Sequence, residues 1–172
     1  MILIAKEISE HNYKAIGSKH PEKRARQKAN KLKNKFQKAM QDIGCSVEKY
    51  EFVSWTEQVE SCPEYQQGYS YVKNLYQEND QFRVDIQQAT EAALKSMKNA
   101  DAGDSHLESI DVEEGVEYLL KELAWLDALP NIFENCKQYV DVYHRGSQLL
   151  EKYFEGFYDG LYRPYFGSVI YE

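Results

Sequence analysis

Tyr118 and Glu122 are the residues whose types and spacing most directly suggest chemistry. They are four positions apart in a segment with helical periodicity, so both side chains lie on one helix face, a single turn apart. A carboxylate beside a phenol can receive an α-ammonium group, because the carboxylate supplies charge and the phenol an additional acceptor. The alternative is structural, with Glu122 on the surface of an amphipathic helix and Tyr118 at the edge of the core.

A strongly basic segment is the second candidate for a binding function. Nine of the chain's 21 Lys and Arg residues lie between Lys19 and Lys38, with Glu22 as the only acid there, although the whole chain has a net charge of −7. Such a local positive field attracts polyanions, and an RNA backbone fits it best. The alternative, a solvated helix face, would normally carry interleaved acids. The cations expected to contact such a backbone are Arg24, Arg26, Lys28, Lys31, Lys33, Lys35 and Lys38.

The elements that position these residues follow from the hydrophobic pattern. Strands are expected at 2–5, 47–55, 138–143 and 166–171, with loops around Gly17 and Pro21 and at 100–109. Helices are expected at 22–43, at 64–97 with a break at Asn79-Asp80, at 111–129 with Pro130 as the stop, and at 147–157. Ser61 is expected to cap the helix that begins near Pro63. Strands separated by helices predict a single α/β domain over residues 1–172, with a mostly parallel sheet flanked by helices.

Several other chemistries lack their characteristic residues. The sequence has no P-loop and no GxGxxG motif. Its four histidines are scattered and its three cysteines lack metal-ligand spacing, so neither a metal nor a cofactor is expected. No apolar run reaches the ~18 residues of a membrane helix. The odd cysteine count suits reduced thiols, and we expect a cytoplasmic protein.

Five segments, taken in order, resemble the tRNA-dependent cyclodipeptide synthases. They are the basic helix closed by Gly44, the turn Cys62-Pro63-Glu64-Tyr65, the helix pair at 64–97, the Tyr-x-x-x-Glu pattern of Tyr118 and Glu122 followed by Pro130, and Val142-Tyr143-His144. Members of this family join aminoacyl groups from two charged tRNAs into a cyclic dipeptide. The resemblance therefore implies a Rossmann-like domain similar to the catalytic domain of class I tyrosyl- and tryptophanyl-tRNA synthetases.

The resemblance also implies roles for individual residues. Tyr118 would position the aminoacyl amine, and Glu122 would hold it and later remove its proton. Tyr143 and His144 would contact the aminoacyl group, and the basic helix would bind the tRNA acceptor arm. No ATP or other cofactor is implied, because the amino acids arrive already activated.

The sequence departs from the family pattern at its N-terminus. In the family, a strand ending in a Gly-x-Ser loop supplies the serine that accepts the first aminoacyl group, whereas here the resemblance begins about one strand later, at Met1. Ser18 in Ile16-Gly17-Ser18 falls in a different place. We therefore expect an N-terminally incomplete domain, with an unpaired sheet edge through which copies of the chain could associate. The alternatives are a non-catalytic tRNA-binding pseudoenzyme or fragment, and an α/β domain that binds another acidic partner.

Overall fold

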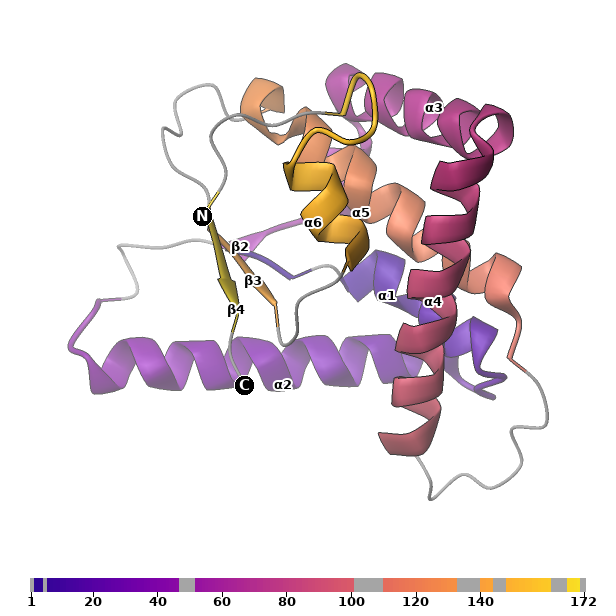
Figure 1. The fold of residues 1–172 in the computed structure, drawn as a ribbon. Coiled ribbons are helices and arrows are strands. Elements are labelled where there is room, and N and C mark those ends of the chain that lie inside the picture. The colour runs from indigo at the N-terminus through magenta and orange to yellow at the C-terminus, as the bar shows by residue number, and fades with distance from the viewer. Residues whose placement is uncertain are drawn as a thin grey trace.

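A computed structural model describes residues 2–4, 6–46, 52–100, 110–132, 140–143, 148–161 and 167–170. Most of these residues are helical, and the helices pack around one another rather than on a broad sheet (Figure 1). Along the chain the elements are β1 (Ile2–Leu3), α1 (Lys6–Ala15), α2 (Pro21–Asp42), β2 (Phe52–Val53), a π-helix η2 (Trp55–Glu60), α3 (Pro63–Glu78), α4 (Asp80–Ala100), α5 (Val112–Ile132), β3 (Val140–Tyr143), α6 (Gln148–Phe154) and β4 (Gly167–Ile170).

The strands correct the predicted fold class. In the described residues they form two separate parallel pairs, β1 with β2 and β3 with β4, so the expected α/β fold with one mostly parallel sheet is wrong there. These strands are only two or four residues long. The physical reason is the spacing of the apolar residues, which recur mainly at three and four and so bury helix faces against one another. Association through a sheet edge stays a prediction.

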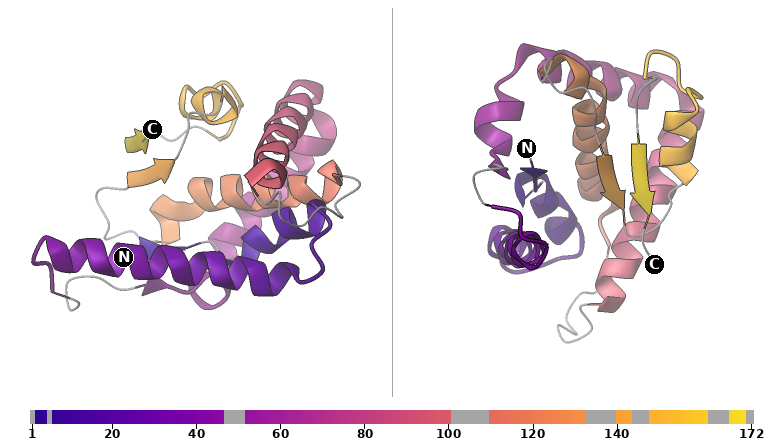
Figure 2. Two further views of the ribbon diagram at one scale, coloured as in Figure 1. Left: turned by 90° about the horizontal axis from the view of Figure 1, so that it is seen from below. Right: turned by 90° about the vertical axis from the view of Figure 1, so that its left-hand side faces the viewer.

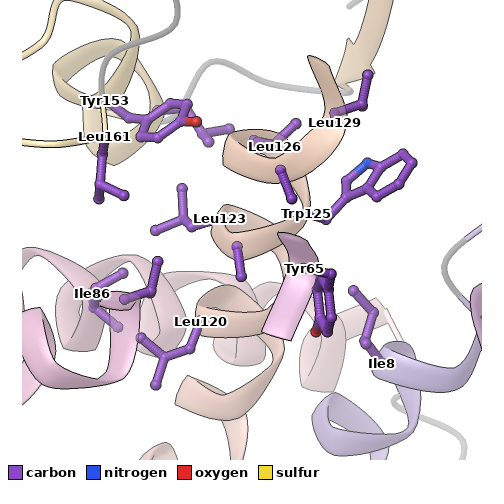
Figure 3. Close-up of a cluster of buried hydrophobic side chains, with 14 of the residues drawn as sticks. Ile8, Tyr65, Ile86, Leu120, Leu123, Trp125, Leu126, Leu129, Tyr153 and Leu161 are labelled. Carbon is purple, nitrogen blue, oxygen red and sulfur yellow. The ribbon is translucent and has the colours of Figure 1, made fainter. Parts of the chain in front are cut away.

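Helix α5 is the centre of the packing. It contacts α1, α3 and α4 more than any other elements, and Figures 1 and 2 show it running among the other helices. Two glycines allow close approach: a Cβ on Gly115 would lie 2.7 Å from Leu94 in α4, and one on Gly68 would lie 3.3 Å from the Ala124 carbonyl oxygen. The main core collects around α5, where Leu120, Leu123, Leu126 and Leu129 are buried (Figure 3).

The predicted basic helix is confirmed as α2, with nearly the expected bounds. Pro21 occupies the first turn, where a missing N–H costs nothing, and Gly44 follows the end with φ +72°, a conformation that favours glycine. Ala25 is the one residue of α2 that is buried among the described residues. The helix packs on α1 and runs along one edge of the molecule (Figure 1), so most of its surface is available to a partner.

Three local predictions fail for identifiable reasons. Residues 6–15 were not expected to be helical, yet α1 forms and buries Ile8 and Ala15. Ser61 does not cap α3; its hydroxyl donates to the Glu57 carbonyl oxygen at 2.7 Å, and Cys62 occupies the cap position. Pro130 does not stop α5, which continues to Ile132, because a proline in the last turn removes only one helical hydrogen bond.

Other predictions are confirmed or fall outside the described part. Asn79 separates α3 from α4, and its side chain accepts a hydrogen bond from the Phe82 N–H at 3.0 Å. Residues 101–109 of the expected loop and 47–51 of the expected strand lie outside the described residues, and Ala100 is the last residue of α4. Of the rest of that strand, Phe52–Val53 is confirmed, whereas Trp55 begins the π-helix. Among the described helices, none is both long and apolar enough to cross a membrane.

Candidate functional site

The structure brings Tyr118 and Glu122 together on α5. The Tyr118 hydroxyl donates a hydrogen bond to Glu122 Oε1 at 3.0 Å, as the i, i+4 spacing predicts. Both side chains are half-buried, and Tyr118 packs against the main core. The pair therefore lies at the boundary between the core and the surface of the helix.

The electrostatics of this pair keep the phenol protonated. Burial raises the pKa of Tyr118 well above its usual value, and the negative charge and hydrogen bond of Glu122 raise it further. Tyr118 therefore donates to the carboxylate at any physiological pH. Because a carboxylate accepts several hydrogen bonds at once, Glu122 can hold the phenol and an ammonium group together. The geometry suits binding of an amine and removal of its proton.

The neighbouring turns of α5 carry further polar contacts. Glu117, which precedes Tyr118, accepts a hydrogen bond from the Tyr69 hydroxyl of α3. Lys121, which precedes Glu122, lies 3.5 Å from a carboxylate oxygen of Glu60 in η2. The pair is thus bordered by residues that join α5 to α3 and η2.

Tyr65 is a further candidate for contact with a ligand. In the sequence it was noted only as part of the turn Cys62-Pro63-Glu64-Tyr65. Its side chain is 1% exposed, yet its hydroxyl has no hydrogen-bond partner among the described residues. The same is true of the indole N–H of Trp55, whose ring meets that of Tyr65 edge-on at 5.6 Å. Buried polar groups normally find hydrogen-bond partners, so these two groups are candidates for contact with a polar ligand. No signal in the sequence distinguishes Tyr65 from the chain's other tyrosines in this respect.

Trp125, three residues after Glu122, is a core residue. It is 8% exposed and lies in the main core, with its ring 6.0 Å from that of Trp55. Figure 3 shows it beside Tyr65 and Leu129.

The structure sorts the predicted RNA-binding cations into two sets. Five of them recur along α2 at intervals of four and three and so form one row, which we call the basic stripe: Arg24, Lys28, Lys31, Lys35 and Lys38. Arg24 is partly buried and the four lysines are exposed. Arg26 and Lys33 lie off this row, and the Lys33 ammonium group lies 4.6 Å from the centre of the Phe52 ring. The stripe presents its charge in one direction, as a linear polyanion requires.

The remaining predicted site residues are only partly covered by the structure. Tyr143 is the last residue of β3 and is opposite Ile170 of β4. His144 lies outside the described residues. Their contacts with an aminoacyl group stay a prediction. Across the described ranges, no cluster of three His, Cys, Asp or Glu side chains is arranged to hold a metal ion.

Ser18 lies in the turn between α1 and α2. Its backbone N–H donates to the Tyr13 carbonyl oxygen at 2.9 Å, and its hydroxyl accepts from the His20 N–H at 3.4 Å. These are the contacts of a turn residue, which agrees with the placement inferred from the sequence.

Comparison with known proteins identifies the family. The chain resembles a cyclodipeptide synthase from Bacillus thermoamylovorans with 20% identity and a TM-score of 0.79, over 99% of this chain and 73% of that one. For one from Staphylococcus haemolyticus the identity is 19% and the TM-score 0.69, over 98% and 74%. For one from Streptomyces noursei they are 14% and 0.64, over 99% and 79%. At such identities these likenesses show a shared fold.

Comparison of the sequence gives one negative and one positive result. No curated protein matched the chain significantly. The family model for cyclodipeptide synthases matches residues 1–163, which is nearly the whole chain, and so confirms the resemblance found from the sequence motifs. The chain belongs to the cyclodipeptide synthase family, whose members are enzymes that use aminoacyl-tRNAs to form cyclodipeptides.

Proposed function

We propose that Tyr118 and Glu122 are the catalytic pair with which this tRNA-dependent cyclodipeptide synthase handles the amine of its aminoacyl substrate. The observation that carries this proposal is the 3.0 Å hydrogen bond between the two side chains, in a chain whose family acts on aminoacyl groups. The carboxylate holds the ammonium group by charge, and the phenol fixes the direction in which the carboxylate points.

The same pair serves the chemical step. An ammonium group cannot attack an ester, so one proton must first leave the nitrogen. Glu122 takes that proton, and the neutral amine attacks the ester carbonyl of the second aminoacyl-tRNA. The new amide bond forms as the ester bond breaks, and the tRNA leaves with its hydroxyl restored. The second amine then loses a proton and attacks the ester carbonyl of the first aminoacyl group, so the second amide bond closes the ring as that ester breaks and its alcohol leaves with a proton. The esters supply the driving force, while the protein supplies position and the base.

Docking of tRNA is assigned to the basic stripe. Its lysines are exposed on the helix that runs along one edge of the molecule, while the whole chain is acidic, with a net charge of −7. The resulting asymmetry steers a polyanion to this edge. Arg26 and Lys33 contribute less, because they face away from the row that the other five cations form.

Three further assignments belong to this proposal. The Tyr65 hydroxyl, which has no hydrogen-bond partner in the described part of the chain, and the residues Tyr143 and His144 contact the aminoacyl group. The location is cytoplasmic, where charged tRNA is available.

A direct assay tests the function. The purified chain is incubated with a mixture of aminoacyl-tRNAs, and the products are analysed by mass spectrometry. We expect cyclic dipeptides from the wild-type chain and none from Glu122→Gln. Binding of tRNA without any product would instead support the non-catalytic alternative, and absence of both would contradict the proposal.

A further inference from the structure

Outside the catalytic pair, a second row of polar contacts runs along α5. We call it the polar seam. Glu113 accepts a hydrogen bond from Tyr76 at 3.2 Å, Glu117 accepts one from Tyr69, and Lys121 lies 3.5 Å from Glu60. The three α5 residues are spaced by four, so they form one face of the helix, turned toward α3 and η2.

The polar seam has a fixed relation to the catalytic pair. Tyr118 and Glu122 each follow a seam residue by one position, which is about 100° around the helix axis. Any rotation of α5 that broke the contacts of Glu117 and Lys121 would therefore swing Tyr118 and Glu122 through the same angle. Contacts at the seam thus set the direction in which the catalytic pair points.

Tyr69 is the residue of the seam with the most connections. Its hydroxyl reaches Glu117 on α5, and its ring stacks on Tyr65 with the planes 3° apart and the centres separated by 6.0 Å. One turn further along α3, the Lys73 ammonium group lies 5.2 Å from the centre of the Tyr69 ring. Tyr69 therefore links the buried Tyr65 to the turn of α5 that carries Tyr118.

We propose that Tyr69 is a positioning residue for aminoacyl transfer, which sets the rotation of α5 through Glu117 and the orientation of Tyr65 through ring stacking. This inference rests on the proposed function of Tyr118 and Glu122. Tyr69 does not itself contact the substrate; it acts through the residues on either side.

Two features make this contact suitable for the role. Burial, followed by the hydrogen bond and charge of Glu117, raises the pKa of Tyr69, so the hydroxyl remains a donor at physiological pH. The neighbouring Gly68 lets α3 approach α5 closely, and tightly packed helices transmit a small displacement to neighbouring side chains.

Removing one hydroxyl tests the proposal. Tyr69→Phe keeps the ring and its stacking but removes the hydrogen bond to Glu117. Tyr71→Phe is the matched control, because Tyr71 lies on the same helix and donates to the Asp159 carbonyl oxygen at 2.7 Å, away from α5. We expect Tyr69→Phe to lower kcat about tenfold or more, with KM for aminoacyl-tRNA unchanged, since small misplacements of catalytic groups are costly while the basic stripe is untouched.

A conservative substitution of Glu117, which accepts the hydrogen bond from Tyr69, provides a second test. Glu117→Gln keeps an oxygen that accepts from Tyr69, and we expect its kcat to stay within about twofold of wild type, whereas Glu117→Ala should resemble Tyr69→Phe. Wild-type kcat in Tyr69→Phe, or equal losses in Tyr71→Phe, would overturn the proposal.

Tryptophan fluorescence gives a readout that does not depend on activity. The chain has two tryptophans, Trp55 beside Tyr65 and Trp125 on α5, with ring centres 6.0 Å apart. We expect the emission of the folded protein to change in Tyr69→Phe and not in Tyr71→Phe. If the wild type forms no cyclic dipeptide, the proposed function fails by itself. An unchanged emission would then overturn the placement of α5 by Tyr69, and a changed emission would support it.

Discussion

At the scale of the residue, the proposed mechanism gives Glu122 two tasks that need different properties. It must be an anion to hold an ammonium group, and a base strong enough to remove a proton from it. The hydrogen bond from Tyr118 fixes its orientation without neutralising it, because the pKa of that phenol is raised and the proton stays on the phenol. A carboxylate positioned in this way is ready for the substrate before it arrives, which lowers the cost of the chemical step.

Replacement of this carboxylate should separate catalysis from folding. We expect Glu122→Gln to abolish cyclic dipeptide formation, because the amide is neither charged nor basic. The melting temperature should change little, since Glu122 is only half-buried and the amide oxygen can still accept from Tyr118. Glu91→Gln, at an exposed carboxylate of α4, is the control and should keep full activity. Normal product from Glu122→Gln would contradict the assigned role.

Loss of the phenol hydroxyl should have a smaller effect. In Tyr118→Phe the carboxylate keeps its charge but loses the hydrogen bond that orients it. We expect kcat to fall by roughly 10- to 100-fold with a stable fold, as for other orienting groups. Single-turnover rates measured with aminoacyl-tRNA would show this, and a rate equal to that of the wild type would exclude Tyr118 from the chemistry.

How far the sequence predicts the site depends on the range of the interaction. The Tyr118–Glu122 contact is local, one turn of one helix, and its spacing alone predicts it. The contact of Tyr69 with Glu117 joins residues 48 positions apart. Nothing in the sequence pairs them, because helix packing decides which of the chain's many tyrosines reaches which carboxylate.

At the scale of the element, α2 carries two rows of side chains, one basic and one apolar, and each residue of the basic row is followed directly by one of the apolar row. The apolar positions expected from the sequence follow the basic stripe by one residue, as in Lys28-Ala29 and Lys35-Phe36. Within this apolar row Ala25 is buried and the Phe36 ring meets the Phe52 ring edge-on at 6.0 Å, whereas Leu32 is 46% exposed. The basic row is thereby held beside it as a straight line of charge.

Equal losses of charge on two sides of α2 should therefore have unequal effects. Lys31→Ala with Lys35→Ala removes two charges from the stripe, and Arg26→Ala with Lys33→Ala removes two from elsewhere on the helix. We expect the first pair to weaken tRNA binding and to lower the slope of log K against log salt by about 1 per lost phosphate contact. The second pair should change both quantities much less. Binding titrations at several salt concentrations measure the difference, and identical slopes would argue against a directional stripe.

Prediction of the elements succeeded where a pattern was long and failed where it was short. The basic helix spans six turns, so its periodicity is unambiguous. The ten-residue α1 was missed because few of its residues are apolar, and burial of Ile8 against the main core stabilises it instead. Two-residue strands carry no detectable alternation, so their pairing could not be predicted.

At the scale of the whole molecule, a partly buried ion pair joins distant parts of the chain. Asp85 of α4 accepts hydrogen bonds from Lys152 of α6 at 2.7 and 2.8 Å and from the Tyr158 hydroxyl at 2.7 Å. The Asp85 side chain is 10% exposed and that of Lys152 22%. Burial alone would raise the pKa of Asp85, but the hydrogen bonds from Lys152, Tyr158 and Gln81 outweigh it, and the pKa is lowered.

The lowered pKa implies a specific dependence of stability on pH. A carboxyl with a depressed folded pKa stabilises the fold above its unfolded value of 3.8, and this contribution is lost as the pH falls through the folded pKa. We expect Asp85→Asn to lower the free energy of unfolding by about 1–3 kcal/mol at pH 7, because it leaves Lys152 without its ion pair.

The difference between wild type and Asp85→Asn should shrink below pH 4, as the wild-type carboxyl becomes protonated. Urea denaturation at a series of pH values measures it. Asp80→Asn, at an exposed aspartate of the same helix, is the control and should show almost no difference at any pH. A gap between wild type and Asp85→Asn that stayed constant down to pH 2 would show that the ion pair does not contribute.

The most direct test of the central claim is the product itself. Cells expressing this chain, and cells expressing Glu122→Gln at the same level, are compared by mass spectrometry of their medium for cyclic dipeptides. We expect cyclic dipeptides only from the cells with the wild-type chain. Their absence from both cultures, or equal amounts in both, would contradict the assignment of Tyr118 and Glu122 as the catalytic pair of this chain.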